Sequence, residues 1–322
     1  MKLLIVTQIV DRTDPVLGFF HRWILEFAKQ VESVEVICLF EGEHTLPKNV
    51  RVHSLGKEKG LQPFFVYALR FLSLSWTLRN RYDRVFVHMN VEYVILTGLL
   101  WRALSKKIAL WYVHGTVSLR LRLALFLSDI VFTTSPESFR IKDSKVHIVG
   151  HGIDTEFFSP DPHVARGKHL LSVGRLTKSK HHDLVIRASR LAGRELRIAG
   201  EGPEEGALRA LAEDLNAAVV FLGGITQEQL RSEYQSADRL IHTSTTGSMD
   251  KVVLEAAACD CDVITTTHGI YNEWPVMSVD ATPEAIAQAI KTTTPYSFDR
   301  VESVRKKFSL SALIPRIISK LS

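Results

Sequence analysis

Short apolar runs alternate with amphipathic helical stretches along nearly the whole chain, and this alternation restricts the fold more than any other feature of the sequence. Such runs, bounded by loop residues, are typical of buried strands. The runs expected to form strands are 3–7, 34–40, 84–89, 108–113, 130–134, 146–149, 169–173, 195–199, 219–222, 239–242 and 263–266. Strands that alternate with helices form βαβ units, so the sequence predicts an α/β protein with parallel sheets.

Three helix starts are marked by residues that accept hydrogen bonds from the amides of a helix amino end. Ser135 and Thr282 each precede a proline, and Thr226 is followed by Gln229 three residues later. These patterns are typical of capped helices, so helices are expected after all three residues.

The length of the chain favours two domains. Its 322 residues, 46% of them hydrophobic, are enough to bury two separate cores. The segment 152–168 is rich in proline, aspartate and histidine and is the best candidate for a linker. We therefore expect a first domain at 1–160, a second at 161–300, and a C-terminal helical segment at 301–322.

Cysteine content and apolar runs exclude several protein classes. Cys38, Cys259 and Cys261 are too few for a disulfide framework, and the last two are too close together for a metal knuckle. The amino-terminal run ends at charged residues without a small-residue cleavage site, which predicts a buried first strand and not a signal peptide. No apolar run is long and uncharged enough to span a membrane. These features favour a cytoplasmic protein with reduced thiols.

Two cations follow an apolar run in the second half of the chain. The run ends at Gly174 and is followed by Arg175 and Lys180, and apolar residues at helical spacing begin at Leu184. Both cations are therefore expected on a strand-to-helix loop, at the edge where parallel sheets bind ligands. The loop is a candidate phosphate site, and the alternative is a solvated basic turn.

A second candidate feature is the helix expected at 251–258. A helix amino end carries unpaired amides and partial positive charge, so the amides of Val252 and Val253 are candidate diphosphate ligands. Glu255, one turn inside the helix, is a candidate ligand of ribose hydroxyls. The alternative is a glutamate that only favours the helix dipole.

Several short motifs occur in an order and spacing that is specific as a set. In the second half these are VGRL with Lys180, IAGEGP (198–203), VVFLGGI (219–225) and LEAAAC followed by VITT; the first half adds MKLLIVTQ, YVHG, DIVFTTSP and VGHGIDTEFFSP. On the basis of these motifs, the chain resembles the retaining glycosyltransferases of family 4 over nearly its whole length. The resemblance implies the GT-B fold, in which two Rossmann-like domains with parallel sheets face each other across a cleft. It also implies that the C-terminal helix crosses back to the N-terminal domain.

The resemblance assigns roles to further residues. Gly18 would lie on the loop that approaches the donor phosphate or sugar, since only a residue without Cβ allows such an approach; alternatively it only permits the turn. His114, expected at the end of a strand, would hydrogen-bond the donor sugar. Gly202 would line the nucleotide side of the cleft, and the loop that includes Ile225 would read the base with backbone groups.

The implied reaction needs no metal ion or other cofactor, because the nucleotide sugar is itself the donor substrate. A nucleoside diphosphate leaves with growing negative charge, which Arg175 and Lys180 would neutralise together with amide dipoles. By the resemblance, a hexose-type sugar passes from a UDP- or GDP-sugar to a glycan or lipid-linked acceptor, with retention at the anomeric carbon.

One position departs from the family pattern. A glutamate that binds donor-sugar hydroxyls usually lies eight residues before the ribose glutamate, and Gly247 occupies that position here. We expect Asp250, or the backbone from Gly247 through Ser248 to Lys251, to replace it, with Lys251 near the phosphate. Because of this change two other functions stay open: a nucleotide-sugar-binding protein without turnover, and a sugar-nucleotide epimerase of the same fold.

Two motifs are typical of other functions. Asp260 and Asp262 match the DxD of metal-dependent transferases, but they precede a strand, at the end opposite the expected phosphate site. Gly200, Gly202 and Gly206 approach a dinucleotide fingerprint, but the third glycine is one residue late. Neither a metal site nor a dehydrogenase is expected.

The charge balance bears on partners. The chain carries 40 Lys and Arg against 35 Asp and Glu, a net charge of +5, which suits an anionic membrane or a phosphate-bearing acceptor. The segments 64–81 and 117–127 mix apolar residues with arginines, as interfacial helices do, and they equally suit helices packed on a sheet. Nucleic acid is not an expected partner, because no recognition motif or stacking series occurs. The inner face of the cell membrane is therefore a candidate location besides the cytoplasm.

Overall fold

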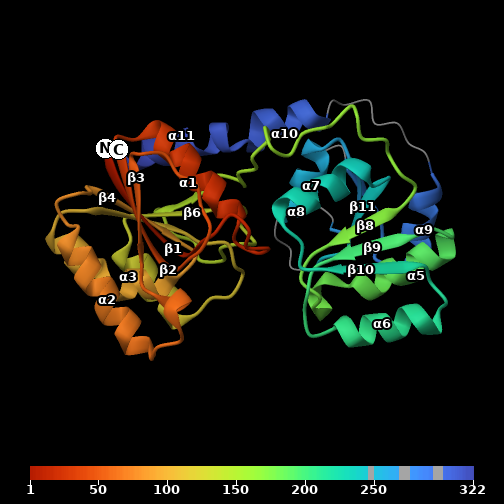
Figure 1. Cartoon of the computed structure of the whole chain (residues 1–322), viewed down its shortest axis with the longest axis horizontal. Helices are drawn as coiled ribbons and strands as arrows, with labels where there is room; N and C mark the ends of the chain where they lie inside the picture. The colour runs from red at the N-terminus through yellow and green to blue at the C-terminus, as the bar shows by residue number, and fades with distance from the viewer. Residues whose placement is uncertain (246–249, 268–275, 293–299) are drawn as a thin grey trace. The chain divides into compact units, whose positions relative to one another are not determined.

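A computed structural model of the protein describes residues 1–245, 250–267, 276–292 and 300–322. The chain divides into two compact units, which we call unit 1 (Met1–Gly152 with Leu310–Ser322) and unit 2 (Ile153–Ser309) (Figure 1). The predicted boundary at residue 160 is therefore too late. The predicted segment 301–322 is also divided, because only its part from Leu310 onward belongs to unit 1.

Unit 1 is built on a parallel sheet, which has seven strands in the order β3-β2-β1-β4-β5-β6-β7 among the described residues. Its elements are β1 (Lys2–Val10), α1 (Phe19–Gln30), β2 (Ser33–Glu41), β3 (Val50–Ser54), the 3₁₀ turn η1 (Lys57–Lys59), α2 (Phe64–Thr77), β4 (Arg84–His88), α3 (Val91–Ala103), β5 (Lys107–Trp111), α4 (Leu119–Leu127), β6 (Ile130–Thr133), β7 (Val146–Ile148) and α11 (Leu310–Leu321). The edge strand β3 is not among the predicted strands, because its apolar residues alternate with polar ones and no residue of it is fully buried.

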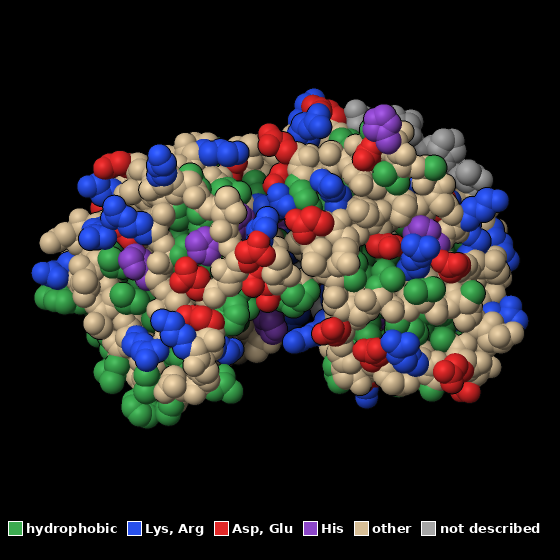
Figure 2. All heavy atoms as spheres, in the orientation of Figure 1, with side chains coloured by type: hydrophobic (Ala, Val, Ile, Leu, Met, Phe, Trp, Pro, Cys, Tyr) green, Lys and Arg blue, Asp and Glu red, His purple; other side chains and the backbone are tan. Residues whose placement is uncertain are grey.

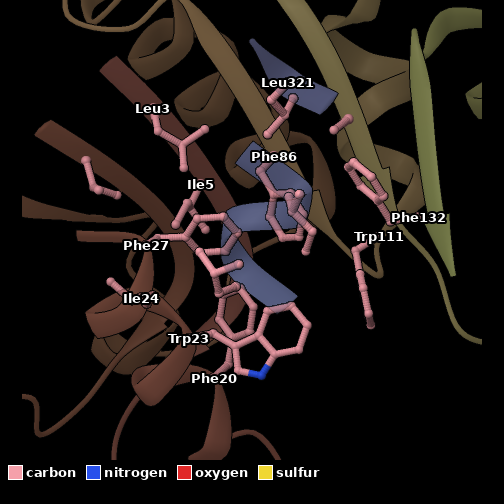
Figure 3. Close-up of a cluster of buried hydrophobic side chains, with 14 of the residues drawn as sticks. Leu3, Ile5, Phe20, Trp23, Ile24, Phe27, Phe86, Trp111, Phe132 and Leu321 are labelled. Atoms are coloured by element: carbon pink, nitrogen blue, oxygen red, sulfur yellow. The ribbon is translucent and has the colours of Figure 1, made fainter. Parts of the chain in front are cut away.

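The C-terminal helix α11 completes the core on one face of this sheet. Its buried residues recur at helical spacing and pack against α1. Figure 3 shows Leu321 of α11 in the same cluster as Phe27 and Trp23 of α1 and Phe86 of β4. At the end of α11, Arg84 Nε donates to the Leu321 carbonyl at 2.7 Å, which satisfies one of the last free carbonyls of the helix. Helices α2, α3 and α4 cover the other face.

Unit 2 has a second parallel sheet, with six strands in the order β10-β9-β8-β11-β12-β13 among the described residues. Its elements are β8 (Leu170–Val173), the 3₁₀ turn η2 (Lys178–Lys180), α5 (His182–Ala192), β9 (Leu196–Ala199), α6 (Glu205–Asp214), β10 (Val219–Gly223), α7 (Gln227–Ser236), β11 (Arg239–His242), α8 (Lys251–Ala258), β12 (Asp262–Thr265), β13 (Met277–Ser278), α9 (Pro283–Lys291) and α10 (Arg300–Phe308). Helix α10 packs on α8 and contributes Val304 and Phe308 to the core. The direction of strand addition reverses between β8 and β11, and open α/β sheets bind ligands at such a switch point.

Two of the three predicted helix starts are confirmed. Thr226 and Gln229 form a capping box before α7, and the Thr282 hydroxyl accepts from the Ala285 amide before α9. The prediction at Ser135 is wrong: the chain makes a single turn there, in which the Ser138 amide donates to Ser135 Oγ at 3.2 Å. In the part of the chain that the structure describes, no helix is both long and apolar enough to cross a membrane.

Candidate functional site

The candidate site of unit 2 lies where the loops after β8 and β11 meet. The Thr243 hydroxyl donates to the Lys180 carbonyl at 2.7 Å, and the Thr245 amide donates to the Ser179 carbonyl at 3.0 Å. These bonds join the two loops at the switch point of the sheet. The prediction that Arg175 and Lys180 lie on a strand-to-helix loop at the carboxyl edge is therefore confirmed.

Lys180 contacts the amino end of helix α8. Its Nζ lies 2.5 Å from Asp250 Oδ2 and 3.2 Å from Ser244 Oγ. Asp250 is the residue that precedes the helix, and the Lys180 and Asp250 side chains are only 20% and 18% exposed. A lysine from the β8 loop thus reaches the amino end of the 251–258 helix.

His242 holds the same carboxylate from the last position of β11. Its Nε2 lies 2.8 Å from Asp250 Oδ2, and its Nδ1 lies 3.2 Å from Thr265 Oγ1. Burial alone would raise the pKa of Asp250, but hydrogen bonds and charges from His242 and Lys180 outweigh it and lower that pKa. Asp250 is therefore ionised and fixed from two sides. His242 is not among the predicted site residues, although it ends the predicted strand 239–242.

Arg175 differs from Lys180 in its surroundings. It is exposed, and within the described residues its guanidinium makes no hydrogen bond or ion pair. Of the two predicted phosphate ligands, Lys180 is therefore fixed by protein contacts, whereas Arg175 keeps its donors for solvent or a ligand.

Glu255 lies in the interior, next to helix α7. It is 4% exposed, and Tyr234 Oη donates to its Oε2 at 3.2 Å. Burial raises the pKa of Glu255, against the opposing effects of Lys251 and Tyr234. Burial likewise lowers the pKa of Lys251 to about 8, against the attraction of Glu255 and Asp250. The ribose-binding role of Glu255 stays a prediction, and in this structure its carboxylate faces Tyr234.

The first turn of α8 corrects part of the predicted anion site. The Val253 amide donates to the Asp250 carbonyl at 3.2 Å, and the Val253 side chain is fully buried in the core. This amide is thus engaged within the turn and is not presented to a ligand. Val252 is half-buried and packs against the same core. Gly247 and Ser248, which we also predicted to bind the donor, lie outside the described residues.

Gly200 and Gly202, in the loop after β9, are needed for close packing against the loop after β8. A Cβ at Gly202 would lie 2.3 Å from the Leu176 carbonyl oxygen, and one at Gly200 would lie 2.0 Å from the Gly174 carbonyl oxygen. The two loops run close together because their backbones hydrogen-bond, for example from the Leu176 amide to the Glu201 carbonyl at 2.9 Å. The contact of Gly202 with a donor stays a prediction. So does that of Ile225, which is half-buried against the core of unit 2.

In unit 1, Gly18 also packs against its own loop. A Cβ there would lie 2.5 Å from the Asp14 carbonyl oxygen and 2.9 Å from that of Arg12. The Gly18 amide donates to the same Asp14 carbonyl at 3.0 Å. These contacts favour the alternative that the glycine permits the turn. The approach of Gly18 to a donor phosphate or sugar stays a prediction.

His114 lines a pocket of about 680 Å³ at the carboxyl ends of β4 and β5, together with Asn90 and Tyr112. Its Nδ1 accepts a hydrogen bond from the Thr116 amide at 3.1 Å. The neutral ring therefore carries its proton on Nε2, which is the tautomer that donates to a hydroxyl. The predicted contact of His114 with a donor sugar remains a prediction.

The DxD carboxylates are both engaged by one arginine. Arg300 of α10 donates to Asp260 Oδ1 at 3.0 Å and pairs with Asp262 through its other terminal nitrogen. Both acids lie at the amino end of β12, opposite the candidate site, as predicted. Among the described residues, no group of three or more His, Cys, Asp or Glu side chains is arranged to hold a metal ion.

Comparisons with known proteins connect this geometry to a family. Residues 167–294 match the family model described as glycosyl transferases group 1. The chain is similar to D-inositol 3-phosphate glycosyltransferase of Mycobacteroides abscessus, at 35% identity over 144 residues. It is also similar to the N-acetylgalactosamine-N,N'-diacetylbacillosaminyl-diphospho-undecaprenol 4-alpha-N-acetylgalactosaminyltransferase of Campylobacter jejuni, at 31% identity over 148 residues. These alignments cover 39% and 44% of the chain, and only 32% and 39% of the relatives' own length.

Solved structures match the chain over its full length. The crystal structure of HepE of Anabaena in complex with UDP and glucose superimposes with a TM-score of 0.75 and 17% identity, and covers 100% of this chain and 99% of that one. Sucrose-phosphate synthase from Thermosynechococcus elongatus superimposes with a TM-score of 0.74 and 15% identity, and covers 99% and 98%. At these identities the likeness concerns the fold, and it confirms the predicted GT-B fold.

Proposed function

We propose that this chain, whose residues 167–294 match the family model of glycosyl transferases group 1, is a glycosyltransferase that uses a UDP- or GDP-sugar as donor. It would move a hexose-type sugar, with retention, to a glycan or lipid-linked acceptor. The observation that carries the proposal is the contact of Lys180 with Asp250 at the amino end of α8. This contact holds a cation beside the helix end, and helix ends of this kind bind phosphate groups.

The charges of the site suit a leaving nucleoside diphosphate. Lys180 would act as a fixed point charge, and the exposed Arg175 would donate two parallel hydrogen bonds to phosphate oxygens. The amino end of α8 adds partial positive charge. Together these groups would stabilise the charge that develops on the leaving group, without a metal ion or other cofactor. A phosphate oxygen would take the acceptor's proton.

We assign Asp250 to the donor-sugar hydroxyls, in place of the glutamate that Gly247 replaces. A carboxylate accepts hydrogen bonds from hydroxyls, and contacts with His242 and Lys180 fix its orientation. Asp250→Ala should weaken binding of the sugar nucleotide more than binding of the free nucleoside diphosphate, because only the former carries the hydroxyls. Equal affinities and turnover in Asp250→Ala and the wild type would rule out this role.

The base is best identified by thermal shift with UDP, GDP and ADP and with their common sugar nucleotides. A ligand that binds only the folded state at 100 times its Kd adds about 2.7 kcal/mol to the free energy of unfolding. We expect a shift with a UDP or GDP compound and a smaller one in Lys180→Met. If no nucleotide shifts the unfolding temperature, the proposed function is wrong.

Turnover separates the transferase from a protein that only binds nucleotide sugars. The purified chain is incubated with the nucleotide sugar that gives the largest shift, and release of free nucleoside diphosphate is measured. We expect slow hydrolysis without acceptor, because water can replace it. A clear thermal shift with no release, even with added glycan or lipid-linked acceptors, would instead indicate a binding protein without turnover.

A membrane is the setting we infer for the acceptor. The Campylobacter jejuni relative is named for a diphospho-undecaprenol substrate, which is a lipid. The net charge of +5 is suited to an anionic surface. We therefore propose that the protein works at the inner face of the cell membrane, as a peripheral protein with a glycan or lipid-linked acceptor.

A further inference from the structure

We infer that the outer face of helices α2, α3 and α4 of unit 1 docks on an anionic lipid bilayer. This inference deepens the membrane partner of the proposed function. The idea that the bilayer supplies the acceptor rests on the proposed function. The docking of this face on a bilayer does not.

The three helices form one layer on a single face of the unit 1 sheet. Phe71 of α2, Trp101 of α3 and Leu121 of α4 are buried in one core cluster with strand residues such as Val87. Helix α3 lies between the other two and contacts both. Their opposite sides therefore point away from the sheet together.

Helix α2 turns a row of large apolar side chains outward. Phe65, Leu69, Leu72 and Trp76 recur at helical spacing, and three of them, Phe65, Leu69 and Trp76, are 63%, 63% and 51% exposed. Phe64, beside them, is 68% exposed. Figure 2 shows hydrophobic side chains gathered at the lower left, over α2. Contiguous exposed apolar side chains of this size are uncommon on a free surface and are typical of a binding face.

Helices α3 and α4 continue the same pattern. Leu119, Leu123 and Phe126 lie one turn apart along α4 and are 85%, 45% and 64% exposed. Leu99, on the central helix α3, is 73% exposed. Apolar side chains thus point outward from all three helices, and burying them in the acyl region would stabilise the bound state.

The charges of this face favour an anionic lipid surface over a second protein copy. The three helices carry four arginines (Arg70, Arg102, Arg120 and Arg122) and one glutamate, Glu92. Arg120 lies 3.5 Å from Glu92, and Arg102 lies 3.6 Å from Asp129, which follows α4, so each of these acids is paired with an arginine. The face keeps a net positive charge from Arg70 and Arg122, so another copy of it would bring like charges together, whereas anionic headgroups attract this charge. Trp76, with Arg79 stacked 4.2 Å from its ring centroid, has the amphipathic character typical of the membrane interface.

The test is co-sedimentation with vesicles of phosphatidylcholine, with and without phosphatidylglycerol. The wild type should bind the anionic vesicles at low salt and lose most of this binding at high salt. Two double variants, Phe65→Ser with Leu69→Ser and Leu119→Ser with Phe126→Ser, should each bind roughly tenfold more weakly or worse. Arg120→Gln with Arg122→Gln should weaken binding to anionic vesicles only. Leu191→Ser is the matched control, because Leu191 is a leucine 51% exposed on α5 of unit 2.

The outcomes separate this inference from the proposed function. The inference is overturned if the wild type does not bind anionic vesicles at low salt, or if the three variants bind as Leu191→Ser does. It is also overturned if sedimentation shows that the serine variants abolish self-association instead, since a second copy would then occupy the face. Thermal shift with UDP and GDP is measured on the same proteins. Vesicle binding without any nucleotide shift would leave the docking face in place and reject the transferase.

Discussion

Replacing Lys180 by methionine tests the contact that carries the proposed function. Methionine keeps most of the length of the side chain and removes its charge. The change therefore deletes the ion pair with Asp250 and the hydrogen bond to Ser244, and it leaves the 3₁₀ turn η2 in place. Lys178→Met is the matched control, because Lys178 is an exposed lysine on the same turn.

The structure sets the expected loss of nucleotide affinity and the expected loss of stability in Lys180→Met. A hydrogen bond to a charged group contributes about 1.5–3 kcal/mol, and the lower value applies because Asp250 already neutralises part of the Lys180 charge. Affinity for a nucleoside diphosphate should thus fall roughly tenfold. The Lys180 and Asp250 side chains are 20% and 18% exposed, between the exposed and the fully buried case. Losing the pair should lower the free energy of unfolding by about 1–2 kcal/mol, which is roughly 2–6 °C in Tm.

The two effects are measured on the same samples by calorimetric titration with UDP or GDP and by thermal unfolding without ligand. Lys178→Met should match the wild type in both measurements. If Lys180→Met binds the nucleotide as tightly as Lys178→Met does, Lys180 is not a phosphate ligand. If only the unfolding temperature changes, the ion pair with Asp250 is structural, and the donor site must be sought elsewhere.

Three further changes test other parts of unit 2. Because the pKa of Asp250 is lowered in the folded protein, its contribution to stability is fully present above its ordinary pKa of about 4 and is lost progressively as the pH falls from there toward the lowered pKa. The difference in unfolding free energy between the wild type and Asp250→Asn should therefore be constant above about pH 5 and narrow steadily below it. Gly202→Ala should lower the free energy of unfolding by about 2 kcal/mol or more, because its Cβ would lie 2.3 Å from the Leu176 carbonyl oxygen. Gly206→Ala, in open space on α6, should raise the free energy of unfolding by about 0.5–1 kcal/mol, and urea titration measures both glycine variants. Tyr234→Phe should lower it by about 1–3 kcal/mol, since the Glu255 carboxylate loses a donor while staying buried; an unchanged urea midpoint would mean that this hydrogen bond contributes nothing.

Local patterns predicted the elements well where the local signal was complete. The strand 239–242 and the capping box at Thr226 depend on a few neighbouring residues, and both occur as expected. The helix start at Ser135 failed although the cap residue and the proline are present. There the Ser135 and Ser138 hydroxyls lie 3.0 Å apart and close a single turn, and the chain leaves it without continuing as a helix. A capping residue alone therefore does not specify a helix.

The sequence by itself determined the βαβ order, the loop that carries Arg175 and Lys180, and the helix that begins at Lys251, because hydrophobic period and loop position are local properties of a chain. Only the tertiary structure decided which side chains meet. The adjacency of β8 and β11 brings Lys180 and His242 to the same Asp250 oxygen, although Lys180 and Asp250 are 70 residues apart. Packing of α7 against α8 turned Glu255 toward Tyr234, since a buried carboxylate needs a hydrogen-bond donor and the sequence does not state where that donor lies.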